Sequence, residues 1–319
     1  MVYTHVPVML AEILEYLAPR PGQKFVDCTL GGAGYTLALA EKVGGTGKIL
    51  ALDLDDLALA NAARLIKEKK LSDIVLVKSN FKKLAAVVSK TFPAGTKFDG
   101  IVFDLGLSSA QLDDEARGFS FKGDRPLDMA FGSDEDNSEN QLENSETETE
   151  TEVRQSTEQI VNNYSIQELT DIFRLYGEEK RSYSIAKAIV DARKIKRIRT
   201  TADLTEIIES VVPLRFRSRI HPATKIFQAL RMETNRELEA LKTVLPDALE
   251  LLKPNGRLVI VSFHSGEDRI VKRFFKENAI SDPARVKILT KRPLIPSEEE
   301  TDSNPRARSA KLRAAQKIR

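Results

Sequence analysis

The sequence contains little of what marks a secreted, metal-binding or membrane protein. It has 319 residues and a single cysteine, Cys28, which excludes an internal disulfide framework and a cysteine metal site. No apolar run approaches the roughly 20 residues of a membrane-spanning helix, and the N-terminus has no basic region followed by an apolar core. We therefore expect a protein of the reducing cytoplasm, without metal or membrane contact, and long enough for about two domains.

The charges are unevenly distributed. Residues 133–152 hold nine acids and no base, and without them the formal net charge rises from +2 to +11. The segment Ser133–Ser156 is rich in Ser, Thr and acids, so we expect it to be disordered. Lys180–Lys225 holds twelve bases against four acids, and Arg285–Arg319 holds ten against four. Such clusters favour a polyanion such as RNA, although a solvated helix face explains any one of them.

The segment Phe25–Asp56 predicts the first βαβ unit of a doubly wound sheet. An apolar strand ends on Asp27, a glycine-rich turn and a helical run follow, and a second apolar strand ends on Asp53. Glycines allow a ligand to approach the backbone closely. Asp53 follows Gly31 by about 20 positions, the spacing of an acid that binds ribose hydroxyls. This pattern predicts a nucleotide-type ligand; the alternative is an α/β domain with a tight turn and no ligand.

The predicted ligand is S-adenosylmethionine rather than a dinucleotide. The glycines at 31, 32 and 34 do not fit the G-x-G-x-x-G pattern of dinucleotide sites. A carboxylate at Asp27 gives a pyrophosphate no advantage, whereas it attracts a cation. S-adenosylmethionine carries a sulfonium and an amino group, so Asp27 and Asp53 suit it better than NAD.

Two more strands are expected to deliver residues to the same edge of the sheet. Ligands of open parallel sheets bind beyond the carboxyl ends of the strands. Phe81 follows the apolar run 74–77 and is placed either to pack on an adenine or in the core. Asp104 directly follows the run 98–103. The polar, glycine-bearing segment from Asp104 to Phe121 stands where a plain crossover helix is expected, which is typical of a functional loop.

The middle of the chain predicts helices. Apolar residues recur at helical spacing between Ile166 and Val212, and a long helix opens at His221 and continues to Pro246. An apolar run at 258–261 predicts a further strand of the sheet. The basic tail Asn304–Arg313 is expected to be partly extended, with Arg306, Arg308 and Arg313 at RNA phosphates.

These patterns define the expected architecture. We predict an α/β fold of the class I (Rossmann-like) methyltransferase type, a doubly wound sheet with an inserted all-helical domain. Residues 1–115 and 221–319 should form the methyltransferase domain. Residues 116–220 should form the inserted domain, which would recognise the substrate.

Nearly the whole chain resembles the RsmH (MraW) methyltransferases of bacteria. Each motif alone is weak, but their order is specific: residues 5–9, 27–36, 53–55, 104–113, 117–121, 126–129, 176–179, 221–231, 262–269 and 304–313. That family methylates N4 of a cytidine in the decoding region of small-subunit (16S) rRNA, with S-adenosylmethionine as methyl donor. The resemblance implies the same activity, with small-subunit rRNA or the small ribosomal subunit as partner. We expect no stable protein partner.

The resemblance also implies a cofactor site. Carried over by matching motifs, its residues are Ala33, Gly34, Tyr35, Asp53, Phe81, Asp104 and Gln111. Ala33 stands where the family usually has glycine, which binding should tolerate if φ is negative there. Ala130 replaces a usual arginine, which leaves a loop or RNA contact in doubt.

Asp104 is also the candidate catalytic residue. Methyl transfer is an in-line displacement in which positioning dominates, and an acceptor for the amine N–H groups would favour the nucleophilic form of the cytosine. His264 is a base, an RNA contact or a structural histidine. Phe119 and Phe121 either stack on an unstacked cytidine or its neighbours or pack in a core.

Two other functions stay open. The first is a class I methyltransferase that acts on DNA, another nucleic acid or protein, although Asp104-Leu105-Gly106-Leu107 replaces the D/N-P-P-Y/W loop of DNA amino-methyltransferases. The second is a non-enzymatic RNA-binding assembly factor. The intact Asp27, Asp53, Asp104 and Gln111 argue against this second function.

Overall fold

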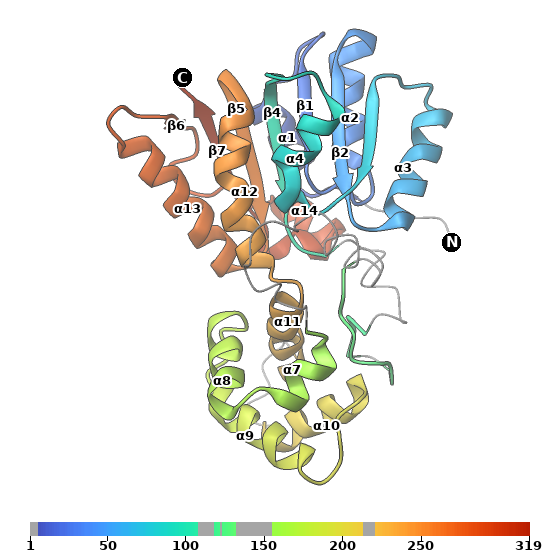
Figure 1. Cartoon of the computed structure of the whole chain (residues 1–319), viewed down its shortest axis with the longest axis vertical. Coiled ribbons are helices and arrows are strands. Elements are labelled where there is room, and N and C mark those ends of the chain that lie inside the picture. The colour runs from blue at the N-terminus through green and yellow to red at the C-terminus, as the bar shows by residue number, and fades with distance from the viewer. Residues whose placement is uncertain (1–5, 108–117, 122, 132–154, 213–220) are drawn as a thin grey trace, which may run out of the picture. The chain divides into compact units, whose positions relative to one another are not determined.

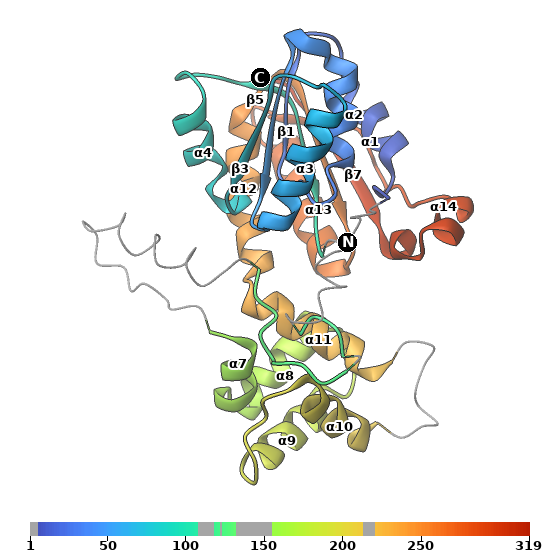
Figure 2. The ribbon, with the colours of Figure 1, turned by 90° about the vertical axis from the view of Figure 1, so that its right-hand side faces the viewer.

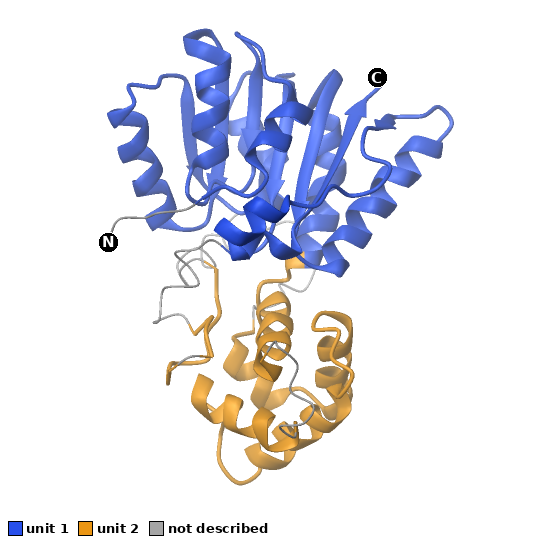
Figure 3. Ribbon diagram, turned by 180° about the vertical axis from the view of Figure 1, so that it is seen from behind, with its two compact units in different colours: residues 1–109, 238–319 blue, residues 110–237 orange. Residues whose placement is uncertain are grey.

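The computed structural model describes residues 6–107, 118–121, 123–131, 155–212 and 221–319. The chain forms two compact units, residues 1–109 with 238–319, and residues 110–237 (Figure 3). Almost all of the acidic segment 133–156 lies outside the described residues, and its disorder stays a prediction. Within the described ranges, no helix combines the length and the apolar character needed to cross a membrane.

Unit 1 is built on a seven-stranded sheet with the order β3-β2-β1-β4-β5-β7-β6. The first five strands are parallel, and β7 is antiparallel to both of its neighbours. The predicted doubly wound sheet is therefore confirmed. The strands are β1 (Lys24–Asp27), β2 (Lys48–Asp53), β3 (Ile74–Lys78), β4 (Phe98–Asp104), β5 (Leu252–Ser262), β6 (Val286–Ile288) and β7 (Lys311–Lys317).

Helices cover both faces of this sheet because alternate strand residues are apolar on each side. Leu50 and Ile101 face a core shared with α4, α12 and α13. Ile49 and Val102 face a core shared with α1 and α2. Figure 2 looks along the sheet and shows α4 on one side and α1 and α2 on the other. The helices are α1 (Leu10–Leu17), α2 (Gly34–Val43), α3 (Asp56–Glu68), α4 (Leu84–Thr91), α12 (Glu237–Leu251), α13 (Ser265–Ile280) and α14 (Glu298–Ser303), with short 3₁₀ turns at Gly44–Thr46, Phe81–Lys83 and Pro305–Ser309.

The basic tail Asn304–Arg313 is partly extended: Pro305–Ser309 form a 3₁₀ turn, and from residue 311 on the chain forms β7, an internal strand of the sheet. β7 lies between β5 and β6, and its Leu312 and Ala314 are fully buried. Arg313 is only 7% exposed, and its guanidinium donates two hydrogen bonds to Asp268, at 2.6 and 3.1 Å. The expectation that Arg313 contacts RNA phosphates is therefore wrong, because this side chain is already neutralised inside unit 1.

Unit 2 is helical, as Figure 1 shows. Its helices are α7 (Thr157–Asn163), α8 (Ile166–Leu175), α9 (Ser182–Arg193), α10 (Thr201–Val211) and α11 (Pro222–Thr234). Leu169, Ile185 and Leu204 are fully buried, one from each of three successive helices. Unit 2 ends at residue 237, whereas the sequence placed the boundary at 220. The difference arises because α11 buries Ile226, Phe227 and Leu230 and packs against α7, α8 and α10.

The predicted long helix from His221 to Pro246 is two helices. α11 ends at Thr234, Arg236 adopts φ +49°, and α12 then runs through Pro246 to Leu251. At the break, the Asn235 side chain donates to the Met129 carbonyl and accepts from the Phe131 N–H. These tertiary hydrogen bonds replace the ones that a continuous helix would make.

Residues 123–131 are held to the helices of unit 2 by hydrogen bonds at both ends. The Thr201 N–H donates to the Arg125 carbonyl, and the Arg125 N–H donates to the Thr201 hydroxyl. This hydroxyl in turn donates to the Gly123 carbonyl. The Leu127 N–H donates to the Arg199 carbonyl. The hydroxyl of Thr157, which is fully buried, donates to the Asp128 carbonyl. The motif at 126–129 is therefore part of the helical unit.

Candidate active site

The glycine-rich turn connects β1 to α2 with two residues in the left-handed region. Gly31 has φ +47° and Ala33 has φ +67°. The Ala33 N–H donates to the Leu30 carbonyl at 2.7 Å, which closes the turn before α2 begins at Gly34. The condition under which alanine would be tolerated at position 33, a negative φ, is therefore not met, and the position requires the conformation for which glycine is the usual choice.

We expect Ala33→Gly to be nearly neutral and Ala33→Val to be damaging. Glycine relieves roughly 1–2 kcal/mol of left-handed strain, but it costs about 0.5–1 kcal/mol of chain entropy and about 0.8 kcal/mol of buried methyl. Valine is β-branched, and Ala33 is fully buried, so we expect a loss of about 2–3 kcal/mol. Urea unfolding of both variants measures this, and a strongly stabilised glycine variant would contradict it.

Asp27 lies inside the turn. It is fully buried, and its carboxylate accepts from the Thr36 hydroxyl at 2.7 Å and from the Thr29 N–H at 3.2 Å. Burial is the main cause that raises the pKa of Asp27 to about 6, and the hydrogen bonds from Thr36 and Thr29 oppose it. Sequence reasoning assigned no role to either threonine, although a hydroxyl in the first turn of the helix is a recognisable signal. Asp27 therefore orders the turn and adds negative potential beneath it.

Asp53 ends β2 and is connected to the same turn. Its two carboxylate oxygens accept from the Gly31 N–H at 2.8 Å and from the Asp55 N–H at 2.9 Å. Burial raises the pKa of Asp53, and these backbone hydrogen bonds lower it. Each carboxylate oxygen has a second lone pair, so this geometry leaves acceptor capacity for a ligand hydroxyl.

Asp104 ends β4 and has the most perturbed carboxyl of the three. Its Oδ1 is buried and has no hydrogen-bond partner among the residues that the structure describes. Burial, followed by the charge of Asp27, raises the pKa of Asp104 to about 8, while the Tyr35 hydroxyl lowers it. The Asp104 N–H donates to the Thr29 hydroxyl at 2.6 Å, which ties β4 to the turn. A buried acceptor without a partner is a candidate ligand contact.

The N-terminal segment packs on the beginning of α2. The hydroxyl of Tyr35, which is 3% exposed, donates to the Val8 carbonyl at 2.5 Å. A Cβ placed on Gly34 would lie 2.7 Å from the Cβ of Pro7, so only glycine fits there without movement. The motif at 5–9 had no role at the level of sequence, and the described part of it, Val6–Met9, supports the turn.

Two other predicted cofactor residues remain. Phe81 follows β3, is partly buried, and packs edge-on against Phe103 with ring centroids 5.7 Å apart. Part of its ring therefore belongs to the core, and part is exposed. Gln111 lies outside the described residues. The structure thus brings the turn, Asp53 and Asp104 together at the carboxyl ends of adjacent strands.

The remaining candidates have structural partners. His264 caps α13, since its Nδ1 accepts from the N–H groups of Gly266 and Glu267. Its Nε2 lies 3.0 Å from a Glu267 carboxylate oxygen, but it is buried and forms no hydrogen bond with any residue that the structure describes. Phe119 is buried and packs on Phe131 in unit 2. Phe121 is stacked on His221 with centroids 4.6 Å apart. His264 therefore has the contacts of a structural histidine, and Phe119 has those of a core residue.

The arrangement suits a cationic nucleoside ligand. Three carboxyls lie at the ends of β1, β2 and β4, and one of them has a buried oxygen with no hydrogen-bond partner among the described residues. Among the described residues, no group of three or more His, Cys, Asp or Glu side chains is placed to hold a metal ion. The acids would instead face hydroxyl, amino and sulfonium groups, which are the polar groups of S-adenosylmethionine.

This strand order, with β7 antiparallel beside β5, and the acids at these three strand ends define a class I, S-adenosylmethionine-dependent methyltransferase. A family model described as the MraW methylase family matches residues 2–318. The chain belongs to this family.

Similar proteins cover the whole chain. A Heliobacterium mobile protein named ribosomal RNA small subunit methyltransferase H is 42% identical, with all of both chains covered. One of the same name from Thermomicrobium roseum is 43% identical and covers 99% of this chain and 94% of its own. Among solved structures, an rRNA methylase from Streptococcus thermophilus is 10% identical, with a TM-score of 0.44 and coverage of 99% and 100%.

Proposed function

We propose that this protein transfers a methyl group from S-adenosylmethionine to N4 of a cytidine in the decoding region of small-subunit rRNA. The observation that carries the proposal is its full-length similarity, at about 42% identity, to proteins named ribosomal RNA small subunit methyltransferase H. The site geometry supports it, since unit 1 offers carboxyls to a cationic cofactor. We place the reaction in the cytoplasm, where the proposed substrate is found.

We assign the cofactor to the edge of unit 1. Asp53 would accept hydrogen bonds from the ribose hydroxyls, and the backbone at residues 33–35 would approach the methionine part. Phe81 would pack on the adenine, and Gln111 completes the proposed set. When bound, S-adenosylmethionine supplies an electrophilic methyl group.

Asp104 would act on the target amine. Its Oδ1, which has no partner among the described residues, is an acceptor for an N4 hydrogen, and this favours the pyramidal amine whose lone pair attacks. After the N–C bond forms, the amine must lose one proton. A carboxylate whose pKa is raised to about 8 is basic enough to take that proton near neutral pH.

A methyl-transfer assay tests the proposal. Labelled cofactor would be offered with naked small-subunit rRNA, with small subunits and with whole ribosomes, followed by nucleoside analysis. We expect N4-methylcytidine from one of these substrates. Label in another nucleoside, in DNA or in protein would favour the alternative, a class I methyltransferase with a different substrate. No transfer despite cofactor binding would favour an assembly factor.

The ribose assignment predicts the effect of Asp53→Ala. Loss of a hydrogen bond to a charged group costs about 1.5–3 kcal/mol, or roughly 10- to 100-fold in affinity. Asp53 also accepts from Gly31 and Asp55, so Asp53→Asn, which keeps one acceptor oxygen, should lose less. Calorimetry with S-adenosylmethionine measures both, and an Asp53→Ala variant that binds as tightly as the parent would contradict the assignment.

A further inference from the structure

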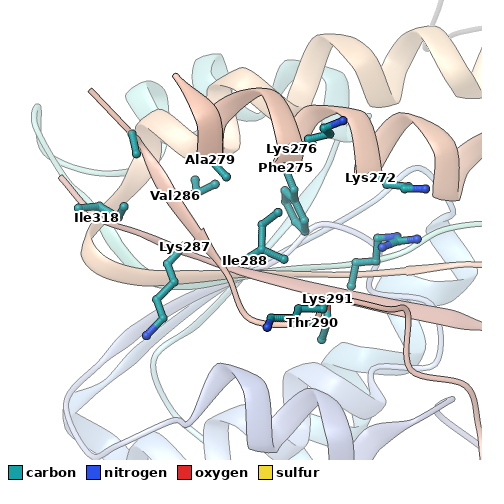
Figure 4. A pocket seen from close by; sticks show the side chains of 12 residues that line it. Lys272, Phe275, Lys276, Ala279, Val286, Lys287, Ile288, Thr290, Lys291 and Ile318 are labelled. Carbon is teal, nitrogen blue, oxygen red and sulfur yellow. The ribbon is translucent and has the colours of Figure 1, made fainter. Parts of the chain in front are cut away.

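An open groove of about 670 Å³ lies in unit 1 between α13 and the edge strand β6 (Figure 4). Its floor is apolar, and Phe275, Val286 and Ile288 contribute to it. Ile318, which is 47% exposed, lies at one end. Phe275 and Val286 are only 2% and 3% exposed and belong to the core of unit 1. The apolar surface that a partner can reach therefore comes from the partly buried Ile288 and from Ile318.

Four exposed lysines line this groove. Lys272 and Lys276 lie one turn apart on α13, and Lys287 and Lys291 come from β6 and the residues after it. Figure 4 shows the first pair on the helix and the second pair on the strand side of the groove, with the Lys287 side chain extending away from the helix. None of the four forms an ion pair with a carboxylate of any residue that the structure describes. Their positive charge is therefore not neutralised within the described protein.

Several bases of the two basic segments, in contrast, pair with carboxylates. In unit 2, Lys194, Lys196 and Arg197 pair with Asp191, Asp203 and Glu158 respectively. In unit 1, Arg285 pairs with Glu250, and Arg313 with Asp268. The sequence predicted RNA contacts in both segments. The buried pair of Arg313 with Asp268 removes Arg313 from this set, whereas the other pairs are exposed and only lower the charge that these bases offer. The lysines of the groove pair with no described carboxylate, so they can contact an anionic partner.

We infer that this lysine groove binds the RNA substrate outside the methyl-transfer site, with phosphates at the four lysines and an unstacked base on the apolar floor. Lysine ammonium groups contact phosphates as point charges. An apolar surface flanked by cations is the composition of sites for single-stranded nucleic acid, where bases contact side chains and the backbone follows the charge. The inference rests on the proposed function, which supplies a large polyanion as substrate.

The test uses the full chain and a single-stranded RNA oligonucleotide from the decoding region. The variant replaces all four lysines with glutamine. We expect its RNA affinity to fall about tenfold or more at low salt. The slope of log K against log salt should become shallower by about 0.7 for each lysine that contacts a phosphate. S-adenosylmethionine affinity should not change, because none of these lysines is in the proposed cofactor site.

The control variant is Lys42→Gln with Lys67→Gln. Both are exposed lysines on α2 and α3 of unit 1, away from the groove, and neither forms an ion pair with any residue that the structure describes. We expect RNA affinity close to that of the parent. Equal losses in the two variants would show only a general charge effect and would overturn the inference.

A second change tests the apolar floor. Ile318→Ser should weaken RNA binding without changing the salt slope, because it removes contact with a base but no charge. Unchanged RNA affinity in the variant with all four lysines replaced would overturn the inference. A competition experiment provides a second check: if polyglutamate binds at the groove and RNA does not displace it, the inference is also overturned. If the parent itself fails to methylate rRNA, the proposed function fails instead, and the two failures are thereby distinguished.

Discussion

Asp104→Asn should lower the rate of methyl transfer at saturating substrate by about 10²- to 10⁴-fold, the usual contribution of a positioned proton acceptor. Asparagine keeps the shape of the side chain and an acceptor oxygen, but it cannot take the proton that the amine loses. Its loss of charge should also weaken cofactor binding. Single-turnover methylation of rRNA and calorimetry with S-adenosylmethionine separate these two effects.

The pH dependence should have the same origin. Because the pKa of Asp104 is raised to about 8, the carboxyl is mostly protonated at pH 6 and becomes an acceptor as the pH rises. The kcat/KM for S-adenosylmethionine, which reports ionisations of the free enzyme, should therefore rise by up to about tenfold per pH unit below pH 8 and level off above it. Asp104→Asn should lose this dependence, and a parent kcat/KM that is flat between pH 6 and 8 would contradict the assignment.

The unliganded protein should show the matching change in stability. The unfolded state ionises Asp104 near the ordinary value of 3.8, whereas the folded state keeps the proton up to about pH 8. The unfolded state then binds fewer protons between these values, so the free energy of unfolding should fall as pH rises from about 4 to 8. Thermal melts of the parent and Asp104→Asn measure this difference.

Asp99→Asn is the matched control for the Asp104 experiments. Asp99 lies on the same strand, near its opposite end, where it accepts from the Lys24 N–H and pairs with Lys253 at 2.8 Å. We expect a modest loss of stability and no change in the pH profile of methyl transfer. A similar flattening in both variants would mean that Asp104 acts through fold stability alone.

Gly118→Ala should have the second large effect, on the helical unit. Gly118 has φ +68°, and a Cβ there would lie 2.2 Å from the Pro126 carbonyl oxygen, a backbone atom that cannot turn aside. We expect about 2–4 kcal/mol of local destabilisation from strain and overlap together. Hydrogen exchange at the amides of Leu127 and Glu158, which hydrogen-bond within this unit, should become faster, and rRNA methylation should fall.

Gly123→Ala measures the effect of backbone strain in the left-handed region without the atomic overlap that Gly118→Ala also introduces. Gly123 lies in the same loop with φ +93°, but a Cβ there would meet nothing closer than 4.0 Å, where the nearest atom is an Arg125 nitrogen. We expect only the left-handed strain of about 1–2 kcal/mol. S-adenosylmethionine affinity should be unchanged in both variants, since the proposed cofactor site lies in unit 1. Equal effects of the two substitutions would contradict the overlap argument.

Much of the site could be predicted from local patterns. The strands that end on Asp27, Asp53 and Asp104 are short apolar runs, and parallel strands place their carboxyl ends at one edge. The apolar stripes of α8, α9 and α10 are likewise visible as helical periodicity. The conformation of Ala33 was not predictable in this way, because its residue type disfavours the φ that the turn imposes.

Local residue patterns were enough to specify the sheet, the helical insertion, the glycine-rich turn and the family, because periodicity and motif order are properties of neighbouring residues. Which bases pair with carboxylates, and which are left without such a partner, depends instead on how the chain folds. Arg313 meets Asp268 only because β7 enters the sheet beside β5. The helix break at Asn235 depends on residues 129 and 131, more than 100 positions away. Such contacts join distant segments, so no local pattern encodes them, and they settle where charge is neutralised and where it is left for a partner.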